Sequence, residues 1–169
     1  MSRVEIRRLE PGDWEGYRSL RLEALHLAPE AFLADLEDEV TRPPEHWRSG
    51  LAPDPDRLVL GAFLEGRLVG MGGLRREKPK KIRHKAGIWG VYVSPVARGL
   101  GLGRRLMERL IAEAREMEGL LQVTLTVAGP NQTARDLYLS LGFRVYGTEP
   151  RAVREGDRFL DDDLMVLFL

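Results

Sequence analysis

A glycine-rich turn is the feature of this sequence that most clearly predicts a binding site. Gly99, Gly101 and Gly103 alternate where a predicted strand and a short loop run into a predicted helix. Such a turn presents bare backbone amides, and the positive end of the helix dipole favours an anion. Arg98 and Arg104 add positive charge around the same point. The pattern therefore predicts a site for a phosphate group, most naturally a pyrophosphate.

The spacing of the glycines excludes two common phosphate-binding motifs. The dinucleotide fingerprint needs glycines at its first, third and sixth positions, but the sixth position is Arg104 counted from Gly99 and Leu106 counted from Gly101. A nucleoside-triphosphate loop ends in Gly-Lys-Ser/Thr, whereas Gly103 is followed by two arginines. A glycine-rich helix start that binds nothing is the remaining alternative for so short a motif.

Composition excludes several classes of partner. The 169 residues predict one domain, residues 1–169. Lysine plus arginine equals aspartate plus glutamate at 26 each, so the chain lacks the basic field of a nucleic-acid-binding protein. With no cysteine and three scattered histidines, it has no ligand-spaced pair for a metal. We therefore expect neither a nucleic-acid partner nor a metal.

The distribution of apolar residues predicts a cytoplasmic protein without membrane spans. No apolar run approaches the roughly 20 residues that a spanning helix needs. Residues 1–10 alternate apolar with charged residues and do not resemble a secretory signal.

Alternating strands and helices position the glycine-rich turn. Two-residue alternation predicts strands at residues 4–9, 58–64, 68–74, 86–93, 121–127, 143–152 and 164–169. Helical spacing predicts helices at residues 14–28, 43–47, 101–118 and 133–141, and Asp13 is placed to cap the first of them. The turn Glu65-Gly66 joins two strands into a hairpin. Residues 121–127 return parallel to 86–93, so a βαβ unit carries the turn.

Two motifs resemble the GNAT (Gcn5-related N-acetyltransferase) superfamily. Val91-Tyr92-Val93-Ser94-Pro95 and Arg98-Gly99-Leu100-Gly101-Leu102-Gly103-Arg104 resemble its acetyl-CoA signature, and Asn131, Ala134, Leu137-Tyr138 and Leu141-Gly142-Phe143 resemble its second motif. The resemblance implies an α/β (α+β mixed-sheet) fold, with a central mixed sheet of six to seven strands and helices on both faces. It also implies an N-acetyltransferase with acetyl-CoA as co-substrate.

The same resemblance implies roles for individual residues. The backbone of Val91, Tyr92 and Val93 would pair with the pantetheine arm and polarise the thioester carbonyl. The residues Gly99, Leu100, Gly101, Leu102, Gly103 and Arg104, together with Arg98, would hold the pyrophosphate. Asn131 would contact the co-substrate. Tyr138 would be the general acid that protonates the departing thiolate, although a tyrosine on a short helix is more often an ordinary core residue.

The general base is not identified by the sequence. An alkyl amine has a pKa of about 10.4 and must lose a proton before it attacks. Where several family members carry a glutamate on a central strand, this chain has Trp89 and Thr126. Residues 35–39, His84 or ordered water remain candidates. Residues 35–39 could also bind a cationic substrate, although a solvated loop is the simpler interpretation.

A basic run lies between Arg75 and Lys85 and contains a single acidic residue, Glu77. Such a run is usually a solvated loop. Its alternatives are docking of an acidic substrate and contact with the 3′-phosphate of CoA, both of which predict salt-sensitive binding.

We therefore expect transfer of an acetyl group to the primary amine of a small molecule, a peptide N-terminus or a lysine. The alternative is a domain of the same fold that binds acyl-CoA without turnover, as a sensor or interaction module. Residues 164–169 are compatible with a homodimer interface and equally with a buried central strand.

Overall fold

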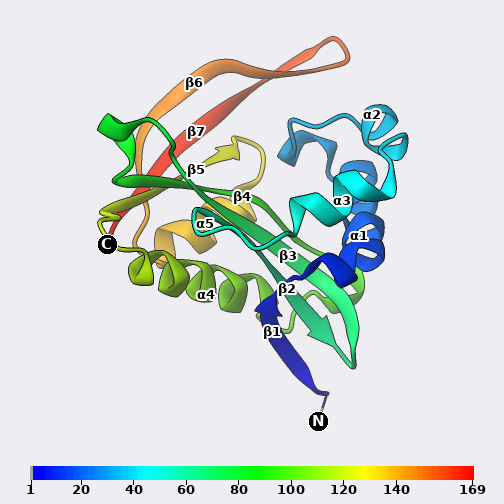
Figure 1. The fold of residues 1–169 in the computed structure, drawn as a ribbon. Coiled ribbons are helices and arrows are strands. Elements are labelled where there is room, and N and C mark those ends of the chain that lie inside the picture. The colour runs from blue at the N-terminus through cyan, green and yellow to red at the C-terminus, as the bar shows by residue number, and fades with distance from the viewer. Residues whose placement is uncertain (1) are drawn as a thin grey trace.

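The computed structural model describes residues 2–169, which form one mixed sheet of seven strands in the order β1-β2-β3-β4-β5-β7-β6 (Figure 1). Neighbouring strands are antiparallel except for β4 and β5, which are parallel. The strands are β1 (Val4–Arg8), β2 (Arg57–Leu64), β3 (Arg67–Arg76), β4 (Lys85–Val93), β5 (Gln122–Ala128), β6 (Arg144–Glu155) and β7 (Arg158–Phe168). The mixed sheet predicted from the sequence is confirmed.

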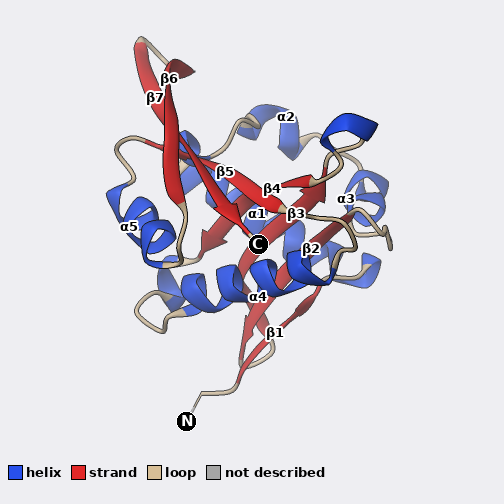
Figure 2. Cartoon of the chain, turned by 90° about the vertical axis from the view of Figure 1, so that its left-hand side faces the viewer, coloured by secondary structure: helices blue, strands red, loops and turns tan. Residues whose placement is uncertain are grey.

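Helices cover both faces of the sheet (Figure 2). The α-helices among residues 2–169 are α1 (Trp14–Leu27), α2 (Leu36–Val40), α3 (Pro44–Gly50), α4 (Leu102–Glu116) and α5 (Gln132–Ser140). Short 3-10 turns connect several elements, among them η2 (Pro29–Ala31), η3 (Lys80–Ile82) and η4 (Pro95–Ala97). No helix in residues 2–169 is both long and apolar enough to cross a membrane.

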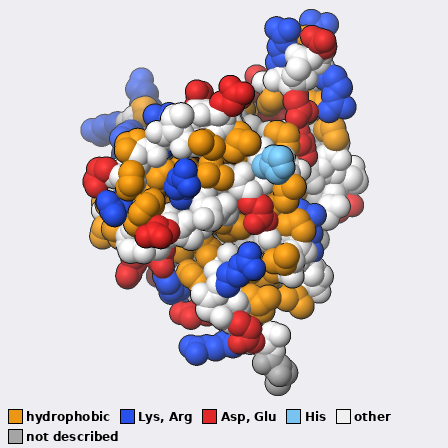
Figure 3. Space-filling view, turned by 90° about the vertical axis from the view of Figure 1, so that its right-hand side faces the viewer, with side chains coloured by type: hydrophobic (Ala, Val, Ile, Leu, Met, Phe, Trp, Pro, Cys, Tyr) orange, Lys and Arg blue, Asp and Glu red, His pale blue; other side chains and the backbone are white. Residues whose placement is uncertain are grey.

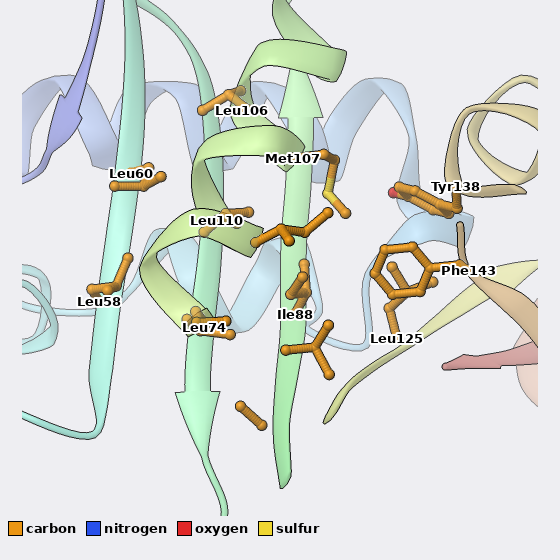
Figure 4. Packing of buried hydrophobic residues seen from close by; sticks show 14 of the residues in the cluster. Leu58, Leu60, Leu74, Ile88, Leu106, Met107, Leu110, Leu125, Tyr138 and Phe143 are labelled. Atoms are coloured by element: carbon orange, nitrogen blue, oxygen red, sulfur yellow. The ribbon is translucent and has the colours of Figure 1, made fainter. Parts of the chain in front are cut away.

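A hydrophobic core lies on each face of the sheet. On one face, α4 and α5 pack on the central strands, and Figure 4 shows Leu106 and Leu110 of α4 above Leu74 and Ile88. These two α4 leucines are fully buried because they recur at four-residue spacing and so point to the same side of the helix. On the other face, α1 and α3 enclose a second core around Trp47.

The β2–β3 hairpin has the predicted turn. Glu65 and Gly66 have φ values of +50° and +81°. Positive φ at both central residues is the geometry of the two-residue turn that matches strand twist. The turn therefore fixes the antiparallel pairing of β2 and β3.

Three sequence expectations are wrong in detail. The last strand begins at Arg158 instead of residue 164, because the acidic residues Asp161, Asp162 and Asp163 lie inside it. Residues 36–40 form α2 and are not a loop. Asp13 is the N-cap residue of α1, but its side chain accepts hydrogen bonds from Arg7 and from the Glu10 amide instead of capping the helix.

The C-terminal strand has neighbours on both sides, since β7 lies between β5 and β6. Of the two interpretations of residues 164–169, the structure favours the central strand. Because β7 has no free edge, a homodimer would have to form through another surface.

Candidate active site

An opening in the sheet separates the carboxyl ends of the two parallel strands. Within residues 2–169, β4 and β5 pair at three positions, from Lys85 opposite Gln122 to Gly87 opposite Thr124. Farther along, β4 carries a bulge at Gly90, whose φ is +63°, where its register with β3 shifts. A bulge bends its strand and increases the local twist. The end of β4 therefore leaves β5, and main-chain groups of β4 face the opening.

The glycine-rich turn follows β4 and η4 and leads into α4. Gly99 and Gly101 have φ values of +80° and +69°, which favour glycine. A Cβ atom at either position would meet no atom within 4 Å, so the space in front of the turn is open. Gly101 is the N-cap of α4, and no side chain caps that end. The first-turn amides can therefore bind an anion there.

The residues between the glycines have different surroundings. Leu100 is exposed, whereas Leu102 is buried in the core, so only the backbone of Leu102 is available to a ligand. Arg98 donates a long hydrogen bond, 3.4 Å, from Nε to the carbonyl of Val93. Arg104 donates to Ser140 Oγ at 2.6 Å, and its side chain remains 45% exposed. Both guanidinium groups thus lie beside the turn and keep donors for an anion.

The side chains of the β4 segment are held by the protein itself. Val91 and Val93 pack into the core beneath α4, whereas Tyr92 points to the opposite face. The Tyr92 hydroxyl donates to Glu23 Oε1 at 3.1 Å, and Ser94 Oγ donates to the same oxygen at 2.7 Å. Burial, and then the contact with Glu23, raise the pKa of Tyr92 to about 12. The Tyr92 side chain is therefore engaged within the protein, and the main chain of this segment is available to bind a ligand.

Glu23 is a site residue that the sequence reasoning missed. It lies on α1, 69 residues before Tyr92, and holds the end of β4 through that hydroxyl and Ser94. No motif links these positions. Glu23 directly precedes the buried Ala24 and Leu25 of α1, which is the one local signal that could have marked it.

Tyr138 lies on α5 on the α4 side of the sheet. It is 7% exposed, and its ring centroid is 6.0 Å from that of Phe143. Figure 4 shows its hydroxyl directed toward α4, on the side of Met107. Within residues 2–169 that hydroxyl makes no hydrogen bond to another side chain or to the backbone. Burial raises the pKa of Tyr138 to about 12, so the phenol is protonated at neutral pH and can act as a donor.

Asn131 starts the helix that carries Tyr138. Its Oδ1 accepts a hydrogen bond from the amide of Ala134 at 3.2 Å, which caps α5. Gly103 of α4 faces the side chain of Leu137 on α5, since a Cβ at Gly103 would lie 3.7 Å from Leu137 Cδ2. The two sequence motifs are therefore brought together, and Asn131 has a structural role besides any contact with a ligand.

The candidates for the general base lie in different places. Asp35 caps α2 by accepting from the Glu37 amide at 2.8 Å. Glu39 is buried, with its carboxylate 3.7 Å from Arg42. His84 precedes β4, and its carbonyl accepts from the Leu121 amide at the end of the strand remote from Val91. The structure thus brings none of the sequence candidates to the opening as an evident base.

The basic run also lies at the remote end of β4. Lys80–Ile82 forms η3 before the strand, whereas Arg98 follows it. Nine residues of strand separate the two ends, which corresponds to about 30 Å. Arg83 is engaged with Asp56 through two hydrogen bonds of 3.1 and 3.0 Å. This geometry favours the interpretation of the run as a surface loop over contact with CoA.

Comparison with known proteins agrees with this geometry. The model of the acetyltransferase (GNAT) family matches residues 17–143. An uncharacterized N-acetyltransferase of Mycobacterium tuberculosis is 34% identical over 113 residues, which make up 67% of this chain and 68% of that protein. The chain belongs to the GNAT acetyltransferase family.

Solved GNAT structures share the whole fold. A GNAT-family acetyltransferase from Streptococcus pneumoniae has a TM-score of 0.89 at 27% identity, with 99% of this chain and 100% of that chain covered. A putative acetyltransferase from Salmonella typhimurium, solved with its cofactor acetyl-CoA, has a TM-score of 0.81 at 26% identity, with 99% and 95% covered. This GNAT protein is an N-acetyltransferase that uses acetyl-CoA, and the predicted family, fold, activity and co-substrate are confirmed.

Proposed function

We propose that this GNAT enzyme binds acetyl-CoA along the carboxyl end of β4 and transfers the acetyl group to the primary amine of a small molecule or a peptide. The observation that supports this most is the opening between β4 and β5, which begins after the Gly87–Thr124 pair and leads to the open glycine-rich turn. Acetyl-CoA supplies an acetyl group activated as a thioester. The confirmed family also favours an enzyme over a sensor that binds acyl-CoA without turnover.

In this proposal the turn holds the pyrophosphate. The amides of Gly101, Leu102 and Gly103 lie at the positive end of α4, and Arg98 and Arg104 supply charge-assisted hydrogen bonds. Gly99 and Leu100 complete the loop before the helix.

The main chain of Val91, Tyr92 and Val93 orients the thioester in the opening. Its N–H and C=O groups can pair with an amide-containing arm as they would pair with a strand. Asn131 contacts the bound co-substrate at the start of α5.

Tyr138 acts as the general acid. The neutral amine nitrogen bonds to the acetyl carbon, and the phenol donates its proton to the departing sulfur as the carbon–sulfur bond breaks. The nitrogen then gives its extra proton to water, and a proton from water restores the phenol. Its raised pKa keeps that proton in place at neutral pH, and its position under α4 excludes most water.

Replacement of Tyr138 by Phe tests this function. We expect kcat for CoA release with an amine acceptor to fall by about 10²- to 10⁴-fold, the usual contribution of general acid–base catalysis. The KM for acetyl-CoA should change little, because the ring and its packing against Phe143 are kept. Tyr146→Phe removes a hydroxyl from a residue that is 58% exposed and is the matched control. A Tyr138→Phe enzyme with unchanged kcat at neutral and high pH would show that the phenol is not the acid.

We further propose that residues 1–169 act as one domain in the cytoplasm and can form a homodimer. Exposed aromatic side chains on β6 and β7, namely Tyr146, Phe159 and Phe168, support such a pairing. Sedimentation across a concentration range measures whether the dimer forms.

A further inference from the structure

We propose that Asp162 on β7, together with Glu149 on β6, binds an ammonium group that the acceptor carries beside its reacting amine, so that the enzyme prefers acceptors with a second positive charge. This inference rests on the proposed function, because it concerns the acceptor of the same reaction. Neither residue belongs to the two family motifs.

The register places the two carboxylates on one face of the sheet. Glu149 lies directly opposite Asp162 in the antiparallel pair of β6 and β7. Side chains at such opposed positions have Cβ atoms about 4.5–5.5 Å apart and point to the same side. The neighbouring Asp163 points toward α5, where it binds Arg135 at 2.9 Å. Because side chains alternate along a strand, Asp162 faces the α1–α3 side of the sheet.

Asp162 is the carboxylate in this segment that the protein leaves without a partner. Asp161 accepts from the amide of Arg151 at 2.8 Å, and Asp163 accepts from Arg135 and from Thr148. Asp162 is 8% exposed, yet within residues 2–169 it forms no hydrogen bond or ion pair with another side chain. Its pKa is raised by burial and then by Glu149 and the adjacent aspartates.

This arrangement costs stability unless a cation joins it. Burial of an unpaired carboxylate is unfavourable, and like charges directly opposite each other destabilise a strand pair. An ammonium group bound between the two carboxylates would remove both the cost of the unpaired buried charge and the repulsion between the like charges. Groups kept in such an unfavourable state are characteristic of functional sites.

The carboxylate pair lies at the level of the proposed thioester. Asp162 pairs with Ala128, which is four residues beyond Thr124 on β5. On β4, Val91 is four residues beyond Gly87, the partner of Thr124. Parallel strands advance by similar distances per residue, and the bulge at Gly90 shortens β4 by about one residue, so Asp162 and Val91 lie within about one residue of the same height on opposite sides of the opening.

The two faces of the opening thus have separate roles. Tyr138 lies on the α4 side, whereas Asp162 and Glu149 point to the α1–α3 side. Figure 3 shows that second side, with the end of the β6–β7 hairpin projecting above the helices and carrying several basic side chains. On this side η2 contacts β5, so the segment between α1 and α2 borders the proposed ammonium site.

Steady-state kinetics with charge-matched acceptors test the inference. The acceptors are 1,4-diaminobutane, butylamine and 4-aminobutanoate. Each offers a primary amine on a four-carbon chain, and the other end of the chain carries a second ammonium group, no charge or a carboxylate, respectively. We expect the wild-type enzyme to prefer the diamine and to use the amino acid least. Asp162→Asn should lower kcat/KM for the diamine at least tenfold, mainly through KM, and reduce the difference between diamine and amino acid. Glu149→Gln should act in the same direction.

The control is Glu155→Gln, which removes the same charge at the exposed end of the hairpin, where Glu155 meets Arg158 at 3.2 Å. Its kinetics should stay within twofold of the wild type. Asp162→Asn should also raise the melting temperature, because it removes an unpaired buried charge, whereas a merely structural aspartate would lower it when replaced. Unchanged charge preference in Asp162→Asn, with CoA release intact, overturns this inference and leaves the proposed function standing. If the wild-type enzyme releases CoA with none of the amines tested, both this inference and the proposed function are overturned.

Discussion

Replacement of Gly101 by alanine tests the anion-binding turn with an internal control. Gly101 has a φ of +69°, and a Cβ there would meet no atom within 4 Å. Gly66 in the β2–β3 turn has a φ of +81° and is equally open. The two substitutions therefore impose the same kind of backbone strain, one at the proposed pyrophosphate site and one far from it.

The expected loss of stability is similar for both variants. A non-glycine residue in the left-handed region costs roughly 1–2 kcal/mol, and part of this is offset because alanine restricts the unfolded chain. A net loss of about 1 kcal/mol corresponds to a fall in melting temperature of about 2–4 °C for a domain of this size. Differential scanning fluorimetry without ligand measures it.

The effect on acetyl-CoA should distinguish the two variants. In Gly101→Ala the new methyl group points into the space in front of the turn and displaces the anion from the amides. Hydrogen bonds to charged groups contribute roughly 1.5–3 kcal/mol, so loss of one raises the KM for acetyl-CoA by about 10- to 100-fold. Gly66→Ala should leave this KM unchanged. Equal KM values in both variants and the wild type would refute the assignment of the turn as the pyrophosphate site.

Two further predictions concern stability. Gly73→Ala should destabilise the fold by about 1–3 kcal/mol, because the new Cβ would overlap the indole of Trp89. Gly87→Ala should cost less, because a Cβ there would meet no atom within 4 Å. Urea titration compares the two variants. The hydrogen bonds from Arg7 lower the pKa of Asp13 in the folded state, so their stabilisation is present above the unfolded-state pKa of about 3.9 and is lost as pH falls through the folded value. Asp13→Asn should therefore lower the free energy of unfolding at pH 7 and have little effect at pH 2, and an equal loss at both pH values would contradict this.

The elements that the sequence predicted well are those with strong local signals. The Glu65-Gly66 turn has one allowed geometry for a short hairpin, and the leucines of α4 recur at helical spacing, so both could be placed without tertiary information. The extent of β7 could not, because Asp161 and Asp163 satisfy their charges with the Arg151 amide and with Arg135, partners that only the folded register brings close.

The same limit applies to the candidate site. The glycine-rich turn acts through consecutive residues, so its spacing was informative. Glu23 and Asp162 act through neighbours that are remote in sequence, Tyr92 and Glu149 respectively. Their positions depend on the insertion of β7 between β5 and β6 and on the packing of α1 against the sheet at β3, neither of which follows from local periodicity.

The short pairing of β4 with β5 has a consequence for amide hydrogen exchange. Beyond Gly87, the β4 amides that point toward β5 lack a strand partner in the described chain, although β3 pairs with the other side. The enzyme thus has an edge strand in the interior of its sheet, with exchange-competent amides flanked by protected ones. A bound amide-containing arm would pair with these free amides of β4. Binding of the ligand should therefore slow the hydrogen exchange of those amides, and the change can be measured for each residue of the strand.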